Sequence, residues 1–281
     1  MREYGTLLRI QNAKDAEAGM TKIKELGFSY CQLVYKPDKY TEEDAKTIRL
    51  AMEKQGVKIV SLFAGYRDSY TKWDAYEDYK TAGINSRRYG KQRIQYIKSA
   101  ALFAKSLGVP DILIHAGFIA NNPFSKEYRY MKKCLETVAV YCKSIGMNLI
   151  LETGGESPIT LRRIIEDMNL GNIFVNLDTA NLIMYGLGNP VDAVYTLGTH
   201  IRSLHIKDGL PPVNPKELGK ETPIGEGFVD FKRFFEELRR TEFAGPIIIE
   251  REIEGQKQAE DLKKAIAYLN SMIDESLYLQ A

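Results

Sequence analysis

The chain has 281 residues, of which 44% are hydrophobic and 27% are charged, a balance typical of a globular protein with one large domain or two smaller ones. Its 39 Lys and Arg residues nearly balance its 37 Asp and Glu residues, and a net charge of +2 argues against binding to nucleic acid or to an anionic membrane. No apolar run approaches the roughly 18 to 20 residues of a membrane span, which argues against an integral membrane protein.

The N-terminal residues and the cysteines bear on the cellular compartment. The opening sequence MREYGTLLRI lacks the apolar core of a signal peptide. The three cysteines, Cys31, Cys134 and Cys142, are odd in number and scattered, so they predict neither a disulfide framework nor a CxxC zinc site. We therefore expect a cytoplasmic protein.

Short apolar runs, mostly of β-branched or aromatic residues, recur along the whole chain. The strands that they predict cover residues 5–9, 30–35, 57–63, 111–117, 148–152, 173–179, 201–207 and 246–250. Short, nearly continuous apolar runs of this kind are typical of parallel strands that are buried on both faces.

Amphipathic stretches between these runs predict helices. Several of them close on a glycine before the next strand, at Gly27, Gly108, Gly146 and Gly245. Eight strands alternating with helices fit a barrel of roughly 250 residues, and no linker divides the chain, so we expect a single (β/α)8 TIM barrel domain over residues 1–281. The alternative is a doubly wound open sheet, but the segment RIQNAKDA after the first strand is not a glycine-rich phosphate loop.

The chemistry of such a barrel lies at the C-terminal ends of its strands. The last four predicted strands carry metal-binding side chains there: Glu152, Asp178, His205 and Glu250. Each could be an ordinary charged strand end, but three carboxylates at one barrel mouth repel one another, and a divalent cation removes that cost. Oxygen ligands with one imidazole favour Mn²⁺, Mg²⁺ or Co²⁺, with Zn²⁺ as an alternative, and the side-chain tips should lie within about 6 Å of one another.

Several motifs are similar to those of one known family. They are ELGFSYCQL from Glu25, ILETGGE from Ile150, NLDTAN from Asn176, LHIKDG from Leu204, and PIGEGFVDFKRFFEEL followed by GPIIIERE. In combination they resemble the sugar phosphate isomerase/epimerase family of xylose isomerase-like TIM barrels. The resemblance implies that the four strand-end residues hold one divalent metal ion, and that Glu152 and Glu250 are also the catalytic acid and base.

The chain departs at two positions from the ketohexose 3-epimerases of that family. Those enzymes carry a His three residues after the metal-binding Asp and an Arg six residues after the metal-binding His, where this chain has Asn181 and Pro211. The differences argue against a free-ketohexose epimerase and leave the metal ligands intact.

We expect a metal-dependent isomerase or epimerase that acts on a ketose, a sugar phosphate or a small hydroxy-carbonyl compound. The proton next to the carbonyl would move through a metal-stabilised enediolate, with the two glutamates as acid and base. Candidate substrate-binding residues are His115, Lys207, Asn181, Arg9 and Trp73. Lys207 could bind a phosphate or a hydroxyl group, or it could be a solvated lysine at the rim, and His115 could equally be a core histidine.

Three other functions remain open alternatives. An inosose-type dehydratase would use a related metal site beside a hydroxyl group that is eliminated. An apurinic endonuclease needs a multi-zinc cluster of several histidines, and this chain has three in total. A non-catalytic sugar-binding barrel has no need of a costly carboxylate cluster. The expected partner is a small sugar or sugar phosphate, and barrels of this family are often homodimers or homotetramers.

Overall fold

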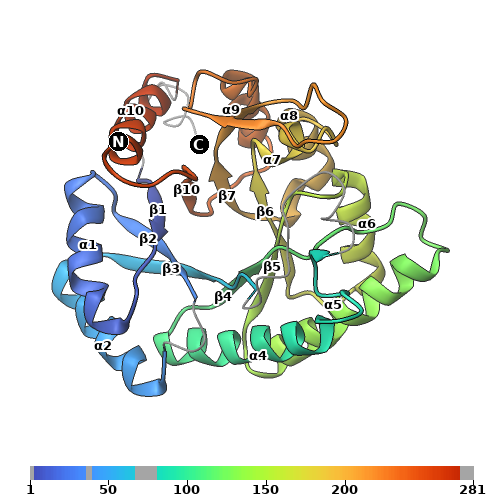
Figure 1. Ribbon diagram of the computed structural model, residues 1–281, viewed down its shortest axis with the longest axis horizontal. Helices are drawn as coiled ribbons and strands as arrows, with labels where there is room; N and C mark the ends of the chain where they lie inside the picture. Colours follow the sequence, from blue (N-terminus) through green and yellow to red (C-terminus); the bar gives the residue numbers. More distant parts are fainter. Residues whose placement is uncertain (1–2, 36–39, 67–80, 273–281) are drawn as a thin grey trace.

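The computed structural model describes residues 3–35, 40–66 and 81–272, and its parallel strands close into a barrel (Figure 1). The strand order around the barrel is β1-β10-β7-β6-β5-β4-β3-β2. The strands are β1 Gly5–Leu8, β2 Tyr30–Val34, β3 Lys58–Phe63, β4 Asp111–Ile114, β5 Asn148–Glu152, β6 Ile173–Asp178, β7 Ile201–Ile206 and β10 Ile247–Ile249. The predicted (β/α)8 TIM barrel is therefore confirmed.

The strands end within one residue of their predicted ends, with one exception. β4 ends at Ile114, whereas the apolar run predicted a strand as far as Gly117. The backbone turns three residues later, at Gly117, which adopts a positive φ of 93°. A Cβ atom on Gly117 would lie 2.3 Å from Gly83 Cα, so only glycine allows the two backbones to come this close. His115 consequently lies in the loop just after β4.

Helices cover the outside of the barrel (Figure 1). They are α1 Ala16–Glu25, α2 Glu42–Gln55, α4 Gly90–Leu107, α5 Lys126–Ser144, α6 Pro158–Met168, α7 Asn181–Met184, α8 Pro190–Leu197, α9 Phe231–Arg239 and α10 Gln256–Met272, with 3₁₀ turns η1 Ala13–Asp15 and η3 Gly198–His200. Local capping explains several starts. Thr41 forms a capping box with Asp44 at the start of α2, and Ser125 accepts a hydrogen bond from the Tyr128 N–H at the start of α5.

Three of the four predicted glycine stops are confirmed. Gly27, Gly108 and Gly146 follow α1, α4 and α5 with positive φ angles of 94°, 76° and 77°. The fourth prediction is wrong, because α9 ends at Arg239, well before Gly245. Gly245 is needed for a different reason, since a Cβ atom there would lie 2.1 Å from the backbone oxygen of Arg202.

A small hairpin after β7 was not predicted. Its strands β8 Asp208–Leu210 and β9 Lys220–Thr222 pair antiparallel. The buried Asp208 carboxylate accepts backbone N–H groups from Gly209, Gly225, Gly227 and Val229, at 2.9–3.1 Å. Asp208 thereby holds the PIGEG loop against the hairpin, which is a structural role for a residue that the sequence placed at the barrel mouth.

The barrel and its helices share one continuous apolar core, which includes Leu33, Ile112, Leu149 and Leu204. Within the described ranges, no helix combines the length and the apolar character needed to cross a bilayer.

Candidate metal centre

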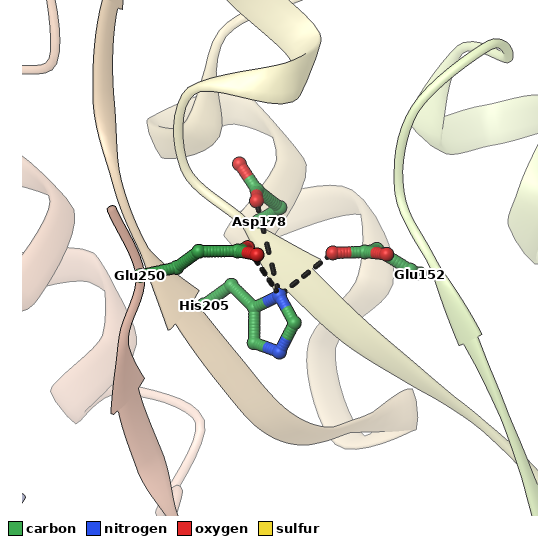
Figure 2. A group of neighbouring side chains, drawn as sticks. All are labelled: Glu152, Asp178, His205 and Glu250. Atoms are coloured by element: carbon green, nitrogen blue, oxygen red, sulfur yellow. Dashed lines mark hydrogen bonds and ion pairs between the residues drawn. The ribbon is translucent and has the colours of Figure 1, made fainter. Parts of the chain in front are cut away.

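Four side chains at the ends of neighbouring strands converge inside the barrel (Figure 2). Glu152 is the last residue of β5, Asp178 is the last of β6, His205 lies in β7, and Glu250 directly follows β10. These strands are consecutive in the barrel, and Asp178 pairs in register with His205. The four residues are buried, and their potential ligand atoms all lie within 4.8 Å of one another. The structure thus brings together all four residues that the strand-end pattern singled out.

The three carboxylates surround a single nitrogen of the imidazole. His205 Nδ1 lies 2.7 Å from Glu152 Oε1, 3.1 Å from Glu250 Oε2 and 3.9 Å from Asp178 Oδ2. In Figure 2, Glu152 and Glu250 approach this nitrogen from opposite sides. This arrangement presents three carboxylates and one imidazole nitrogen to a common centre, so the group could bind one divalent cation.

The two oxygens of Asp178 have different environments. Oδ1 accepts the backbone N–H groups of Ala180 and Asn181, each at 2.8 Å, at the start of α7. Oδ2 accepts no hydrogen bond from any described residue, although it lies 3.2 Å from the Lys207 ammonium. A buried carboxylate oxygen without a hydrogen bond is costly. Asp178 Oδ2 lies beside the potential ligand atoms of Glu152, His205 and Glu250, and coordination of a metal would satisfy it. The residues present therefore suit a divalent ion.

Burial and mutual repulsion shift the protonation equilibria of the cluster. Burial raises the pKa of Asp178 to about 7, and the charges of Glu152 and Glu250 add to this effect while Lys207 opposes it. Burial alone would lower the pKa of His205, but the charges of Glu152 and Glu250 and the hydrogen bonds to them outweigh it and raise this pKa to about 10. Burial also acts to raise the pKa of Glu250, yet Lys207 and His205 hold it well below its usual range. Positive charge at the centre of the three carboxylates would therefore stabilise their ionised forms, and a divalent ion supplies such charge.

Lys207 lies within this cluster rather than at its rim. Its Nζ is 3.2 Å from Asp178 Oδ2, 3.8 Å from Glu250 Oε2 and 2.7 Å from Glu252 Oε1, and its side chain is only 2% exposed. Burial acts to lower the pKa of Lys207, but the carboxylates outweigh it and hold this pKa well above its usual range. The alternative of a solvated rim lysine is therefore wrong.

Sequence reasoning missed the residues that contact the other nitrogen of His205. Gln32 Oε1 lies 2.9 Å from His205 Nε2, and Gln32 Nε2 donates to Ser61 Oγ at 2.8 Å. Both residues are buried, on β2 and β3. The one available signal was a polar residue in the middle of each of the largely apolar runs YCQLV and IVSLF.

The imidazole of His115 lies beside the loop that follows Glu152. A Cβ atom on Gly154 would lie 2.3 Å from His115 Cε1, so the glycine makes room for the ring. Burial lowers the pKa of His115, which favours a neutral imidazole. The hydroxyl group of Tyr66 donates to the backbone oxygen of His115.

The remaining predicted substrate-binding residues differ in how close they lie to the four ligand candidates. Arg9 is 47% exposed, with its Nη2 atom 3.8 Å from Glu250 Oε1 at the edge of the cluster. Asn181 is buried, and its side-chain amide donates to the backbone oxygen of Thr153 at 3.0 Å. Trp73 lies outside the described residues.

A second buried carboxyl group near Glu152 was also missed. Glu156 lies in the loop after β5 and accepts the Gly154 N–H at a long 3.4 Å. Burial raises its pKa to about 8, and the charge of Glu152 adds to the shift. The motif ILETGGE contains this residue, but nothing in its sequence surroundings predicted that the loop would be buried.

Comparison with known proteins found relatives in sequence and similar solved structures. The chain is 27% identical over 171 residues to an L-ribulose-5-phosphate 3-epimerase UlaE of Escherichia coli O1:K1 / APEC, and the match spans 57% of this chain and 56% of that relative. It is 24% identical over 256 residues to the enzyme of the same name from Salmonella heidelberg (strain SL476), covering 82% and 80% of the two chains.

Among solved structures, a xylose isomerase domain protein from Planctomyces limnophilus has a TM-score of 0.87 at 28% sequence identity, with 96% of each chain covered. The family described as xylose isomerase-like TIM barrel matches residues 20–272. With most of its length matched, in keeping with the closed barrel and the motifs at its strand ends, the chain belongs to the xylose isomerase-like TIM barrel family.

Proposed function

We propose that the protein is a divalent-metal-dependent sugar isomerase or epimerase. Its substrate would be a ketose, a sugar phosphate or a small hydroxy-carbonyl compound. The observation that carries the proposal is the convergence of Glu152, Asp178, Glu250 and His205 at one buried centre. The two relatives named as epimerases, L-ribulose-5-phosphate 3-epimerases, support the reaction class.

Glu152, Asp178, His205 and Glu250 would hold the metal ion. When bound, the ion supplies positive charge that stabilises the negative charge developing on the substrate oxygens. Glu152 and Glu250 approach the centre from opposite sides (Figure 2), so one carboxylate can take the proton from one face of the substrate carbon and the other can deliver a proton to the opposite face. General acid–base catalysis of this kind contributes roughly 10²- to 10⁴-fold to the rate.

Two further groups would orient the substrate. Arg9 is half-exposed beside Glu250, so its guanidinium is accessible to a hydroxyl or phosphate oxygen. His115, with a lowered pKa, would contact the substrate as a neutral imidazole. Lys207 would act mainly on the carboxylates, because its ammonium is already surrounded by Asp178, Glu250 and Glu252.

The test is a substrate screen with metal-stripped protein. Ketoses, their phosphates and inososes are incubated with and without Mn²⁺, and the products are identified by NMR. A change of configuration or of carbonyl position that requires Mn²⁺ supports the proposal. Loss of water from an inosose would instead identify a dehydratase. Turnover that is unaffected by chelator would contradict the metal requirement.

The cellular location, the oligomeric state and the domain organisation of the protein stay predictions. The three cysteines are buried free thiols, which fits a cytoplasmic location. The homodimer or homotetramer and the single domain over residues 1–281 likewise remain expectations, which sedimentation and limited proteolysis would test.

A further inference from the structure

A pair of buried polar residues reaches His205 from the opposite wall of the barrel. Gln32 and Ser61 pair in register on β2 and β3, whereas His205 lies on β7. Gln32 and His205 are 173 positions apart in the chain, yet their side chains meet inside the barrel with 2.9 Å between Gln32 Oε1 and His205 Nε2. We infer that Gln32, supported by Ser61, is a positioning residue that holds His205 in the tautomer able to bind the metal through Nδ1.

The inference rests on the proposed metal site and follows from the chemistry of imidazole. A neutral imidazole carries one N–H group and one lone pair, and only the nitrogen with the lone pair can bind a metal. The carboxylates of Glu152, Asp178 and Glu250 all lie around Nδ1. For Nδ1 to be the ligand, the hydrogen must be on Nε2, and an acceptor must face it.

Gln32 provides that acceptor. Its Nε2 amide group donates to Ser61 Oγ at 2.8 Å, which leaves Oε1 to accept from His205 Nε2. With the amide reversed, an NH₂ group would face Nε2 and drive the imidazole hydrogen onto Nδ1, where it blocks the ligand position. Ser61 thus matters because it accepts the amide hydrogens in the productive orientation.

An irregularity in the pairing of β2 with β3 places Gln32 directly opposite Ser61. The pairing of β2 with β3 shifts between Cys31 and Gln32, so that Cys31 lies opposite Ile59 while the next residue, Gln32, lies opposite Ser61. Such an irregularity re-aims a side chain. Polar groups this deeply buried are costly unless they are hydrogen-bonded, and here the partner is a metal-ligand candidate.

The chain contains a matched control pair. Ser203 Oγ donates to Asn176 Oδ1 at 2.6 Å, and both residues are buried and paired in register on β7 and β6. Across the described ranges, no hydrogen bond joins their side chains to those of the four ligand candidates. Ser203→Ala therefore disrupts a buried polar pair in the same barrel without removing a hydrogen bond to the His205 side chain.

The experiment measures Mn²⁺ binding to the metal-stripped 281-residue chain by isothermal titration calorimetry. Gln32→Met removes the acceptor at nearly constant length, and the dissociation constant should rise roughly 10- to 100-fold, as for other partners that orient a metal-binding histidine. Gln32→Glu keeps an oxygen acceptor and should bind as tightly as wild type. Ser203→Ala should leave the affinity unchanged.

The outcomes separate this inference from the function it rests on. Wild-type protein that binds no Mn²⁺ would overturn the proposed function, and the inference with it. If wild type binds and Gln32→Met binds equally well, or if Gln32→Glu fails to restore affinity, the positioning role alone is overturned. Equal losses in Gln32→Met and Ser203→Ala would also overturn it, because they indicate a general packing effect. Should Gln32→Met not fold, Ser61→Ala replaces it, with a weakened affinity expected and an unchanged one contradicting the inference.

Discussion

The ammonium of Lys207 lies 3.2 Å from the Oδ2 atom of Asp178, with both side chains withdrawn from solvent. The same ammonium is 3.8 Å from Glu250 and 2.7 Å from Glu252. Removing one partner of a buried ion pair leaves the other as an uncompensated charge. Lys207 therefore stabilises the ionised carboxylates whenever no metal ion is bound.

Lys207→Met should lower the free energy of unfolding of the metal-free protein by roughly 3–5 kcal/mol, the usual cost of breaking a buried pair. Urea unfolding in the presence of chelator measures this change. The matched control is Lys46→Met, because Lys46 pairs with Glu43 on the surface of α2, where both side chains are exposed. The control should change stability little. Equal effects of the two substitutions would contradict a stabilising role for the buried lysine.

Binding of Mn²⁺ should stabilise the folded chain, because the ion relieves repulsion among carboxylates that are far apart in the unfolded state. A single site filled at 100 times its dissociation constant adds about 2.7 kcal/mol to the free energy of unfolding. The measurement is chemical unfolding with and without Mn²⁺, with reversal by chelator. Asp178→Ala removes a ligand candidate and should lose most of the gain. A gain of the same size in this variant would place the ion elsewhere.

The raised pKa of Glu156 should make the free energy of unfolding depend on pH. Burial raises its pKa from 4.5 to about 8, so between these values the folded chain keeps a proton that the unfolded chain has lost. Its contribution to stability is complete below the unfolded pKa and disappears as the pH rises through the folded pKa, with a slope of about 1.4 kcal/mol per pH unit.

Glu156→Gln stays neutral at every pH and lacks this loss. The stability of the variant relative to wild type should therefore rise with pH across the window from 4.5 to about 8 and level off beyond it. Denaturant unfolding of both metal-free proteins at a series of pH values gives the difference. A difference that does not vary with pH would show that Glu156 ionises normally in the folded chain.

The ligand candidates could be predicted because their positions follow from local patterns. Each of Glu152, Asp178, His205 and Glu250 comes at the end of an apolar run, and parallel strands in a barrel bring such ends to one place. The burial of Lys207 could not be predicted in this way. A lysine one residue beyond a strand is usually solvated, and only the three carboxylates contributed by two other segments, the end of β6 and the stretch after β10, explain why it lies inside.

The contact between Gln32 and His205 could not be predicted either. It joins strands that are not neighbours, so it depends on how the barrel closes and on the register shift in the pairing of β2 with β3. The hairpin anchored by Asp208 escaped prediction because its strands are three residues each and their alternation is too short to recognise. Local periodicity thus predicts strands and their ends, whereas contacts across the barrel require the folded structure.

The most direct test of the account is exchange of solvent deuterium into substrate at the carbon next to the carbonyl, because both Glu152 and Glu250 are proposed to bind the metal and also to move this proton. Wild-type protein with Mn²⁺ should introduce deuterium, and metal-stripped protein should not. Glu152→Gln and Glu250→Gln should each stay slow even with saturating Mn²⁺, because an amide cannot carry the proton. Turnover by wild type without any exchange, together with full recovery of both variants in excess metal, would contradict the account and favour a hydride shift in which the two glutamates act as ligands alone.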